Sequence, residues 1–183
     1  MSAPRYRSAM NARLSERETL DLWCSLPPIP LETMIGRWRG DEVPSNHPMS
    51  GLLSVSGWYG KAFVDPETVH PLLFWNASRT GVFAVHPSRL PMGLPVPVTS
   101  LLRLGVVLGR PYLATRQPTA RLRMVELYGV TSAAMVYDHR PIVDGFRRLD
   151  DDRLMGLMDR RGDHAPLFFT LERDDATPLR VTW

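Results

Sequence analysis

From residue 120 onward, apolar residues fall in short runs at close intervals, separated by turn-like peptides. Each run has the length and the β-branched or aromatic content of a strand. The pattern predicts strands at residues 121–128, 131–137, 141–149, 154–159, 167–173 and 180–183. Gly129, between the first two, predicts a bulge or bend. Short connections between consecutive strands indicate an antiparallel meander.

The first thirty residues predict an arm followed by one helix. Residues 1–13 are rich in arginine and serine. Ser15 and Glu18 have the spacing of a capping box, and Leu20, Trp23 and Cys24 follow at helical spacing. The prolines at positions 27 and 28 end this helix. We therefore expect Cys24 to be a small apolar residue on the buried face.

The segment between this helix and residue 90 predicts further strands. Residues 34–43 form the first, residues 72–75 and 81–85 form a hairpin, and residues 52–63 fit either a helix or a strand. Residues 65–67, with proline in the second position, predict one short helical turn.

A proline-rich insert separates the two strand regions. Residues 87–97 predict irregular structure, and residues 99–108 predict a helix that can act as a lid.

These elements predict a mainly β protein: an antiparallel β-barrel or half-barrel, closed by the N-terminal strand and capped by a few short helices. The arm and helix occupy residues 1–30, and a single barrel domain occupies residues 31–183. That domain divides into a first strand region (31–90), the insert (91–119) and the meander (120–183). In the pentapeptide Gly36-Arg37-Trp38-Arg39-Gly40, the glycines allow close backbone approach while Trp38 plugs one end. Gly36, Trp38 and Gly40 are therefore predicted to be structural.

Composition excludes several classes of protein. The chain has 183 residues, is 44% hydrophobic and carries a net charge of +3. We expect no membrane span, no signal peptide and no nucleic-acid binding, because the chain has no uncharged apolar stretch of 18 residues, no apolar region beside its N-terminal arginines and no sustained basic stripe. One cysteine excludes an internal disulfide and a cysteine metal cluster. We expect a cytoplasmic protein.

Lys61 is the only lysine; every other basic residue besides histidine is an arginine. Either an ammonium group is required at this position, or one exposed lysine survives by chance. The five histidines form no metal-binding spacing, so no metal site or cofactor is predicted. His47 and His164 are the weak candidates for a metal or an axial haem ligand.

The candidate ligand-binding residues combine aromatic and charged side chains. Such a mixture suits a pocket that is mostly apolar with a few orienting polar groups. The aromatic candidates are Trp58, Tyr59, Tyr137 and Phe146, and the polar candidates are Lys61, Asp144 and Arg147.

Several motifs together resemble a bacterial and plant family with an N-terminal GXWXG domain and a C-terminal domain of unknown function. The likeness covers about residues 30–175. It rests on residues 36–40, His47-Pro48, residues 56–63, residues 132–138, residues 140–144, residues 157–159 and residues 171–174.

The resemblance implies no catalytic residues, because the family has none established. Its first motif is similar to that of nitrobindin-like and fatty-acid-binding barrels, which supports a lipocalin-like fold by analogy. Residues 41–44 replace the longer glycine-rich run of nitrobindin-like proteins, so a haem-nitrosyl role is disfavoured.

Three functions follow as hypotheses, with a non-enzymatic carrier or sensor of a small, largely apolar molecule favoured. The first alternative is an isomerase or cyclase that uses Lys61, Tyr137 or Asp144 as acid or base. The second is a haem-binding protein or an interaction protein that forms a homodimer through the strand edge at residues 180–183.

Overall fold

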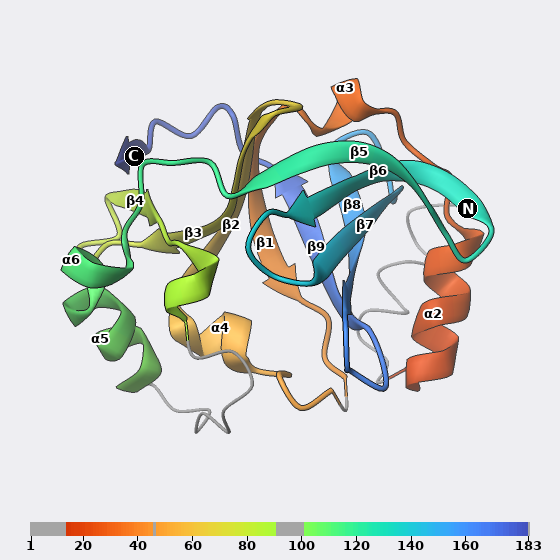
Figure 1. Cartoon of the computed structure of the whole chain (residues 1–183), viewed down its shortest axis with the longest axis horizontal. Coiled ribbons are helices and arrows are strands. Elements are labelled where there is room, and N and C mark those ends of the chain that lie inside the picture. The colour runs from red at the N-terminus through yellow and green to blue at the C-terminus, as the bar shows by residue number, and fades with distance from the viewer. Residues whose placement is uncertain (1–13, 46, 91–100, 183) are drawn as a thin grey trace.

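The computed structural model describes residues 14–45, 47–90 and 101–182 (Figure 1). The helices are α2 (Glu16–Ser25), α3 (Leu31–Met34), α4 (Leu52–Ser56), α5 (Leu101–Leu108) and α6 (Arg110–Leu113), with the 3-10 turn η1 (Pro87–Arg89). The strands are β1 (Gly36–Glu42), β2 (Trp58–Asp65), β3 (Thr68–Trp75), β4 (Gly81–Ala84), β5 (Ala120–Leu127), β6 (Val130–Tyr137), β7 (Ile142–Arg148), β8 (Arg153–Arg160), β9 (Leu167–Arg173) and β10 (Arg180–Thr182).

The strands form one sheet that curves into a ring. Their order is β10-β4-β3-β2-β1-β9-β8-β7-β6-β5, and the ring closes where β3 pairs with β5 at Val69 and Ala120. The pairings are antiparallel except that of β10 with β4. The prediction of a mainly β, antiparallel fold with a few short helices is confirmed. Within the described residues, no helix is long and apolar enough to cross a membrane.

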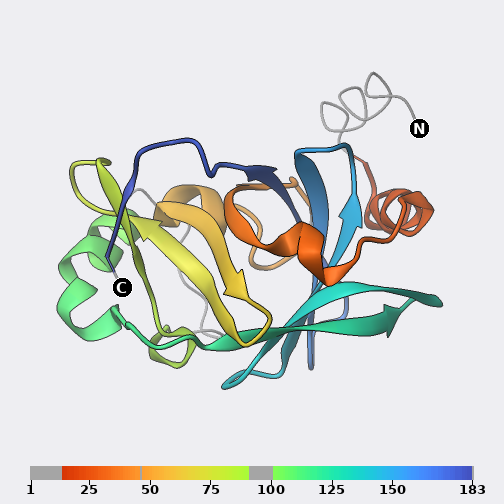
Figure 2. The ribbon, with the colours of Figure 1, turned by 90° about the horizontal axis from the view of Figure 1, so that it is seen from above.

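The largest apolar cluster lies inside the ring, and α2 covers part of the outside (Figure 2). The capping box of α2 forms as predicted, between Ser15 and Glu18. Trp23 is fully buried, and its indole N–H donates to the carbonyl of Met155 at 3.2 Å. Cys24 is half-buried and packs against the apolar cluster that contains Trp23 and Met155.

Several predicted boundaries differ from the structure. The first strand begins at Gly36, because Leu31–Met34 form α3. The ambiguous residues 52–63 contain both α4 and the start of β2. Residues 65–67 form a hairpin turn and not a helical one, since the Asp65 carboxylate accepts the Glu67 and Thr68 amides at 2.8 Å.

Gly129 is likewise part of a hairpin turn and not a bulge. Tyr128 and Gly129 have φ values of 54° and 76°, and the β5–β6 pairing runs unbroken from Leu127–Val130 to Ala120–Tyr137. The two positive φ angles match the right-handed twist of the flanking strands.

The insert lies at the end of the molecule opposite α2 (Figure 1). The predicted helix is present as α5, followed by α6. Residues 91–97 of the predicted irregular segment, the first two residues of the predicted helix (99 and 100), the predicted arm at residues 1–13 and Trp183 of the last strand lie outside the described residues.

Candidate functional site

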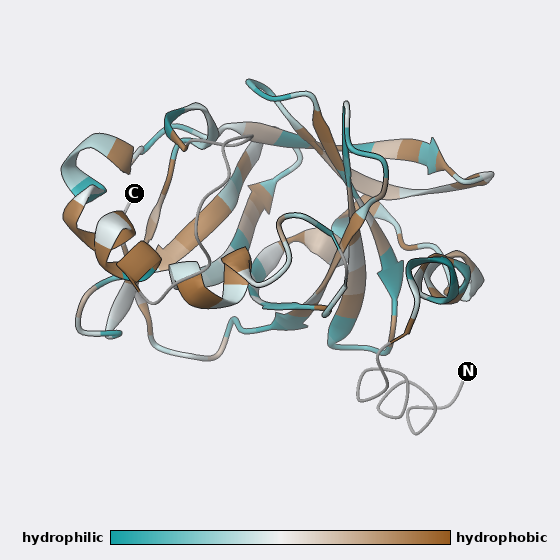
Figure 3. Cartoon of the chain, turned by 90° about the horizontal axis from the view of Figure 1, so that it is seen from below, coloured by the Kyte–Doolittle hydropathy of each residue, from teal (hydrophilic) through white to brown (hydrophobic). Residues whose placement is uncertain are grey.

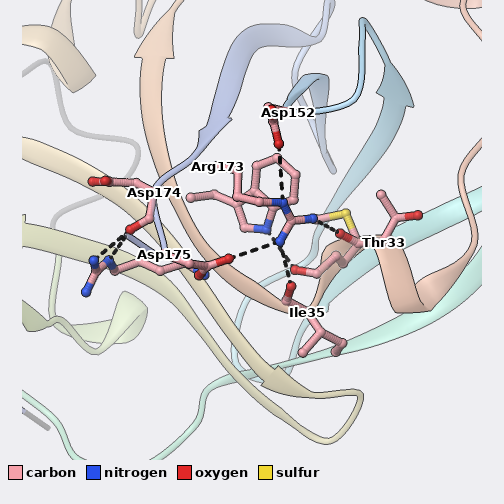
Figure 4. Close-up of polar contacts among 9 residues, drawn as sticks. Thr33, Ile35, Asp152, Arg173, Asp174 and Asp175 are labelled. Carbon is pink, nitrogen blue, oxygen red and sulfur yellow. Dashed lines mark hydrogen bonds and ion pairs between the residues drawn. The ribbon is translucent and has the colours of Figure 1, made fainter. Parts of the chain in front are cut away.

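Trp38 of β1 lies beside Arg173, whose contacts with Thr33 and Ile35 are shown in Figure 4. Its side chain is fully buried, and its indole N–H donates to the carbonyl of Met34 at 2.8 Å. The guanidinium of Arg173 lies 4.2 Å from the centre of the indole ring and donates to the carbonyls of Thr33 and Ile35 at 2.7 and 3.0 Å. The tryptophan, α3 and the end of β9 are thus held as one unit.

Gly40 makes room for a second tryptophan. A Cβ atom at Gly40 would lie 2.1 Å from the ring of Trp58, a separation that real side chains do not reach. Trp58 is 7% exposed and packs edge-on against Phe169 at 5.9 Å between ring centres. The small residue on β1 therefore allows a large one on β2 to fill the interior.

Gly60 turns the next side chain inward. The pairing of β2 with β3 shifts register on either side of Gly60, which has a φ of 147°. In a regular strand Trp58 and Lys61 would face opposite sides, because they are three residues apart. The bulge removes that offset, so Lys61 joins Trp58 inside the ring while Tyr59 packs on the outer face.

Lys61 forms a buried ion pair with Asp144 of β7. The Nζ atom lies 2.8 Å from Asp144 Oδ2, and the two side chains are 3% and 1% exposed. Nζ also donates to the carbonyl of Pro71 at 3.2 Å. The pair joins strands on different sides of the ring interior.

Three aromatic rings surround the ammonium group. Nζ lies 5.6 Å from the ring centre of Trp58, 5.9 Å from that of Tyr137 and 4.9 Å from that of Phe169. The negative faces of aromatic rings attract a cation, and more strongly where water is excluded. The rings and Asp144 together replace the water that Lys61 would bind at the surface.

Burial also changes the acid–base properties of this cluster. It raises the pKa of Asp144, and the neighbouring Lys61 charge offsets part of that rise. Burial raises the pKa of Tyr137 well above its ordinary value, and the Asp144 charge raises it further. The carboxyl group is therefore the member of the cluster whose titration moves toward neutral pH.

Two buried polar atoms of the cluster have no hydrogen-bond partner among the described residues: Asp144 Oδ1 and Trp58 Nε1. The first accepts hydrogen bonds and the second donates one. Buried polar atoms are nearly always paired, so each such exception calls for an explanation.

Phe146 lies in the same interior, with ring centres 5.9 Å from Phe63 and 6.2 Å from Phe169. Five predicted residues are thus brought together: Trp58, Lys61, Tyr137, Asp144 and Phe146. Phe169 and the Pro71 carbonyl were missed. The alternation of Leu167, Phe169 and Leu171 on one face of β9 could have placed Phe169 inside.

Tyr59 and Arg147 lie outside the ring, away from this cluster. The Tyr59 hydroxyl donates to Asp174 at 2.6 Å. The Arg147 guanidinium lies 4.0 Å from the centre of the Trp23 ring, under α2. Arg147 is three residues from Asp144 on a regular strand, so the two side chains face opposite sides of β7.

The two histidine candidates are placed differently. Both ring nitrogens of His47 have partners, since Nδ1 accepts the Met49 amide at 3.1 Å and Nε2 lies 3.3 Å from Asp163. His164 is exposed. Within the described residues, no group of three or more His, Cys, Asp or Glu side chains is arranged to hold a metal ion.

Comparison with known proteins yields two family matches and a solved structure. Residues 21–78 match the GXWXG protein family, and residues 118–173 match the domain of unknown function DUF4334. A crystal structure of a protein from Thermomonospora curvata is 32% identical, with a TM-score of 0.66 over 88% of this chain and 89% of that one. No curated protein matches. The chain belongs to the GXWXG–DUF4334 family.

The interior cluster draws on both matched regions. The GXWXG region supplies Trp58 and Lys61, and the DUF4334 region supplies Tyr137, Asp144 and Phe169. The regions are also joined by strand pairing, β1 with β9 and β3 with β5. Gly40 of the GXWXG motif contacts the cluster at the ring of Trp58.

Proposed function

We propose that this protein binds a small, largely apolar molecule inside the ring, oriented by the Lys61–Asp144 pair. The observation that carries the proposal is the pair of unpartnered buried atoms, Asp144 Oδ1 and Trp58 Nε1, among aromatic side chains. Ligand sites combine an apolar lining with a few placed polar groups. A purely structural interior would be better served by apolar residues at these positions.

The two atoms specify the polar part of the ligand. Trp58 Nε1 needs an acceptor, and an ionised Asp144 Oδ1 needs a donor. A hydroxyl group provides both from one oxygen atom. The aromatic rings of Tyr137, Phe146 and Phe169 suit an apolar body of the same molecule.

Calorimetric titration with three matched probes tests this proposal. Benzyl alcohol, benzyl methyl ether and toluene share a phenyl ring but differ in hydrogen bonding. We expect benzyl alcohol to bind about thirtyfold more tightly than toluene, with the ether between them, because each of its two hydrogen bonds contributes about 1 kcal/mol. Native mass spectrometry against the denatured mass then reveals any molecule retained from the cell.

The Trp58→Phe variant removes the donor and keeps an aromatic ring. It should lose the preference for the ether over toluene while still binding toluene. Trp75→Phe is the matched control, since Trp75 packs with Tyr59 on the outer face. Equal affinities for the three probes, or the same loss in the control, would contradict the proposal.

A second candidate function is acid–base catalysis on the bound molecule. The raised pKa of the buried Asp144, next to the Lys61 ammonium, favours it, because an acid or base works best when its pKa lies near the working pH. The carboxylate would remove a proton next to a carbonyl group while the ammonium hydrogen-bonds to the carbonyl oxygen. Isomerisation and cyclisation can both use this step.

Deuterium exchange of cyclohexanone in D₂O, followed by NMR, separates the two functions. An enzyme would accelerate exchange at the carbons next to the carbonyl, and Asp144→Asn would abolish the acceleration. A carrier would bind the probe and leave its exchange rate unchanged.

A further inference from the structure

An apolar stripe on α5 and α6 faces solvent at the end of the molecule opposite α2 (Figure 3). Leu101, Leu104 and Leu108 are 70%, 52% and 70% exposed, and Tyr112 is 70% exposed. The three leucines follow i, i+3, i+7 spacing and so share one helix face. Val106, on another face of α5, is 6% exposed and belongs to the core. The helix is therefore apolar on the side that the protein leaves uncovered.

The same part of the chain carries a concentrated positive charge. Between Glu67 and Glu126 there are seven arginines and no aspartate or glutamate. The rest of the chain has 15 basic and 19 acidic residues. The net charge of +3 thus hides two oppositely charged regions.

Five of these arginines gather around the stripe. Arg103 and Arg110 belong to α5 and α6, and Arg116 follows α6. Arg89 donates to the carbonyl of Tyr112 at 2.8 Å, and Arg79 lies two residues from Ala77, whose carbonyl accepts from Arg103 at 3.5 Å. None of the five forms an ion pair within the part of the chain that the structure describes. Their charges are available to an outside partner.

A pocket of about 270 Å³ opens between the stripe and the β3–β4 turn, lined by Ala77, Arg103, Leu104 and Val107. Arg103 Nε is buried there without a hydrogen-bond partner among the described residues. An apolar wall beside an unpaired guanidinium N–H suits a phosphate group attached to an acyl chain.

We propose that the α5–α6 face, formed by Leu101, Leu104, Leu108, Tyr112 and the five arginines, docks on an anionic phospholipid bilayer. Exposed leucines flanked by basic side chains are the arrangement of helices that lie in a membrane interface. Charge complementarity selects a membrane over a second copy of this chain, because a symmetric contact through this face would bring like charges together. The proposal is independent of any ligand inside the ring.

Vesicle co-sedimentation of the full chain tests this proposal. The vesicles contain either pure phosphatidylcholine or a 7:3 mixture of phosphatidylcholine and phosphatidylglycerol. We expect at least about tenfold stronger partitioning onto the anionic vesicles, since each arginine near such a surface contributes about fivefold. Raising the salt concentration to about 0.5 M should remove most of that difference.

Variants of the face identify it, and circular dichroism checks that each variant is folded. Leu104→Ser/Leu108→Ser and Arg103→Gln/Arg110→Gln should each weaken binding by about tenfold or more. Met124→Ser and Arg17→Gln are the matched controls, because both residues are exposed on other elements. The controls should bind like the wild type.

Equal partitioning onto both vesicle types, or equal loss in the controls and the face variants, would overturn the proposal. Analytical ultracentrifugation tests whether a second copy of this chain binds to the face instead. A dimer that Leu104→Ser/Leu108→Ser dissociates, in a protein that binds no vesicles, would assign the face to a second copy and reject the membrane.

Discussion

The ammonium group of Lys61 is held by one carboxylate, one carbonyl and three aromatic faces. Removing a charge from water costs several kcal/mol, and an ion pair in the interior recovers that cost only when its geometry is good. With Asp144 Oδ1 unpartnered among the described residues, the hydrogen bonding of this pair is incomplete. This incomplete bonding supports the ligand site proposed above.

A double variant tests whether the pair stabilises the fold. Lys61→Met leaves Asp144 buried without its partner, so we expect the free energy of unfolding to fall by about 3–5 kcal/mol. Lys61→Met/Asp144→Leu removes both charges. Its free energy of unfolding should lie within about 1 kcal/mol of the wild-type value or exceed it. Urea denaturation measures both values. A double variant as unstable as the single one would show that the pair is structural.

The raised pKa of Asp144 makes stability depend on pH. Because burial favours the protonated carboxyl, this contribution is fully present below the ordinary carboxyl pKa of about 4. It is lost as the pH rises through the raised pKa. As the pH rises from about 4 to the raised pKa, the free energy of unfolding of the wild type should fall relative to that of Asp144→Asn. The fall is at most about 1.4 kcal/mol per pH unit.

Urea denaturation at a series of pH values measures this difference. Asp144→Asn is the reference because it shares every other titrating group. A difference that is constant, or that grows in favour of the wild type as the pH rises, would contradict the assignment.

At the scale of the element, the close contact of β1 with β2 depends on the absence of a side chain at Gly40. Gly40→Ala would push the Trp58 ring out of the interior, since the new Cβ atom would lie 2.1 Å from it. We expect a loss of about 1–3 kcal/mol in the free energy of unfolding and a changed near-ultraviolet circular dichroism spectrum.

Gly105→Ala in α5 is the matched control for this variant. A Cβ atom there has no heavy atom within 4 Å, so alanine should raise helix stability by about 0.5–1 kcal/mol. An unchanged spectrum in Gly40→Ala would mean that Trp58 keeps its place without the glycine.

Strand alternation explains how much of the site the sequence could predict. Alternation along residues 142–148 places Asp144 and Phe146 on one face of β7, and both side chains lie in the interior cluster. The same rule places Arg147 on the opposite face from Asp144, so the sequence alone could have shown that the two do not line one pocket. The inward turn of Lys61 depends on the bulge at Gly60, which is set by the pairing with β3 and has no local pattern to predict it.

At the scale of the whole molecule, antiparallel order was predictable because short turns join neighbouring strands between β5 and β9. The expected closure by the N-terminal strand is present as the pairing of β1 with β9, but its register was not predictable, because these strands are separated by more than a hundred residues. The ring brings together side chains that are far apart in the sequence, and no local sequence pattern predicts such contacts.

The ring has one sparsely bonded seam. β3 and β5 share one register pair, supported by the Thr119 amide to the Val69 carbonyl at 3.1 Å and the Leu122 amide to the Pro66 carbonyl at 2.8 Å. By contrast, β7 and β8 pair over seven positions. Local opening should therefore be easiest at the seam, and we expect the Thr119 and Leu122 amides to exchange deuterium at least about tenfold faster than interior amides of β8.

Hydrogen exchange followed by NMR measures these rates, and equal protection on both sides of the ring would contradict the expectation. This seam bears on how the proposed ligand reaches the Lys61–Asp144 pair, whose side chains are 3% and 1% exposed. Separating β3 from β5 breaks few hydrogen bonds and leaves every other ladder intact. We therefore expect the proposed ligand to enter and leave at the seam while the rest of the ring stays folded.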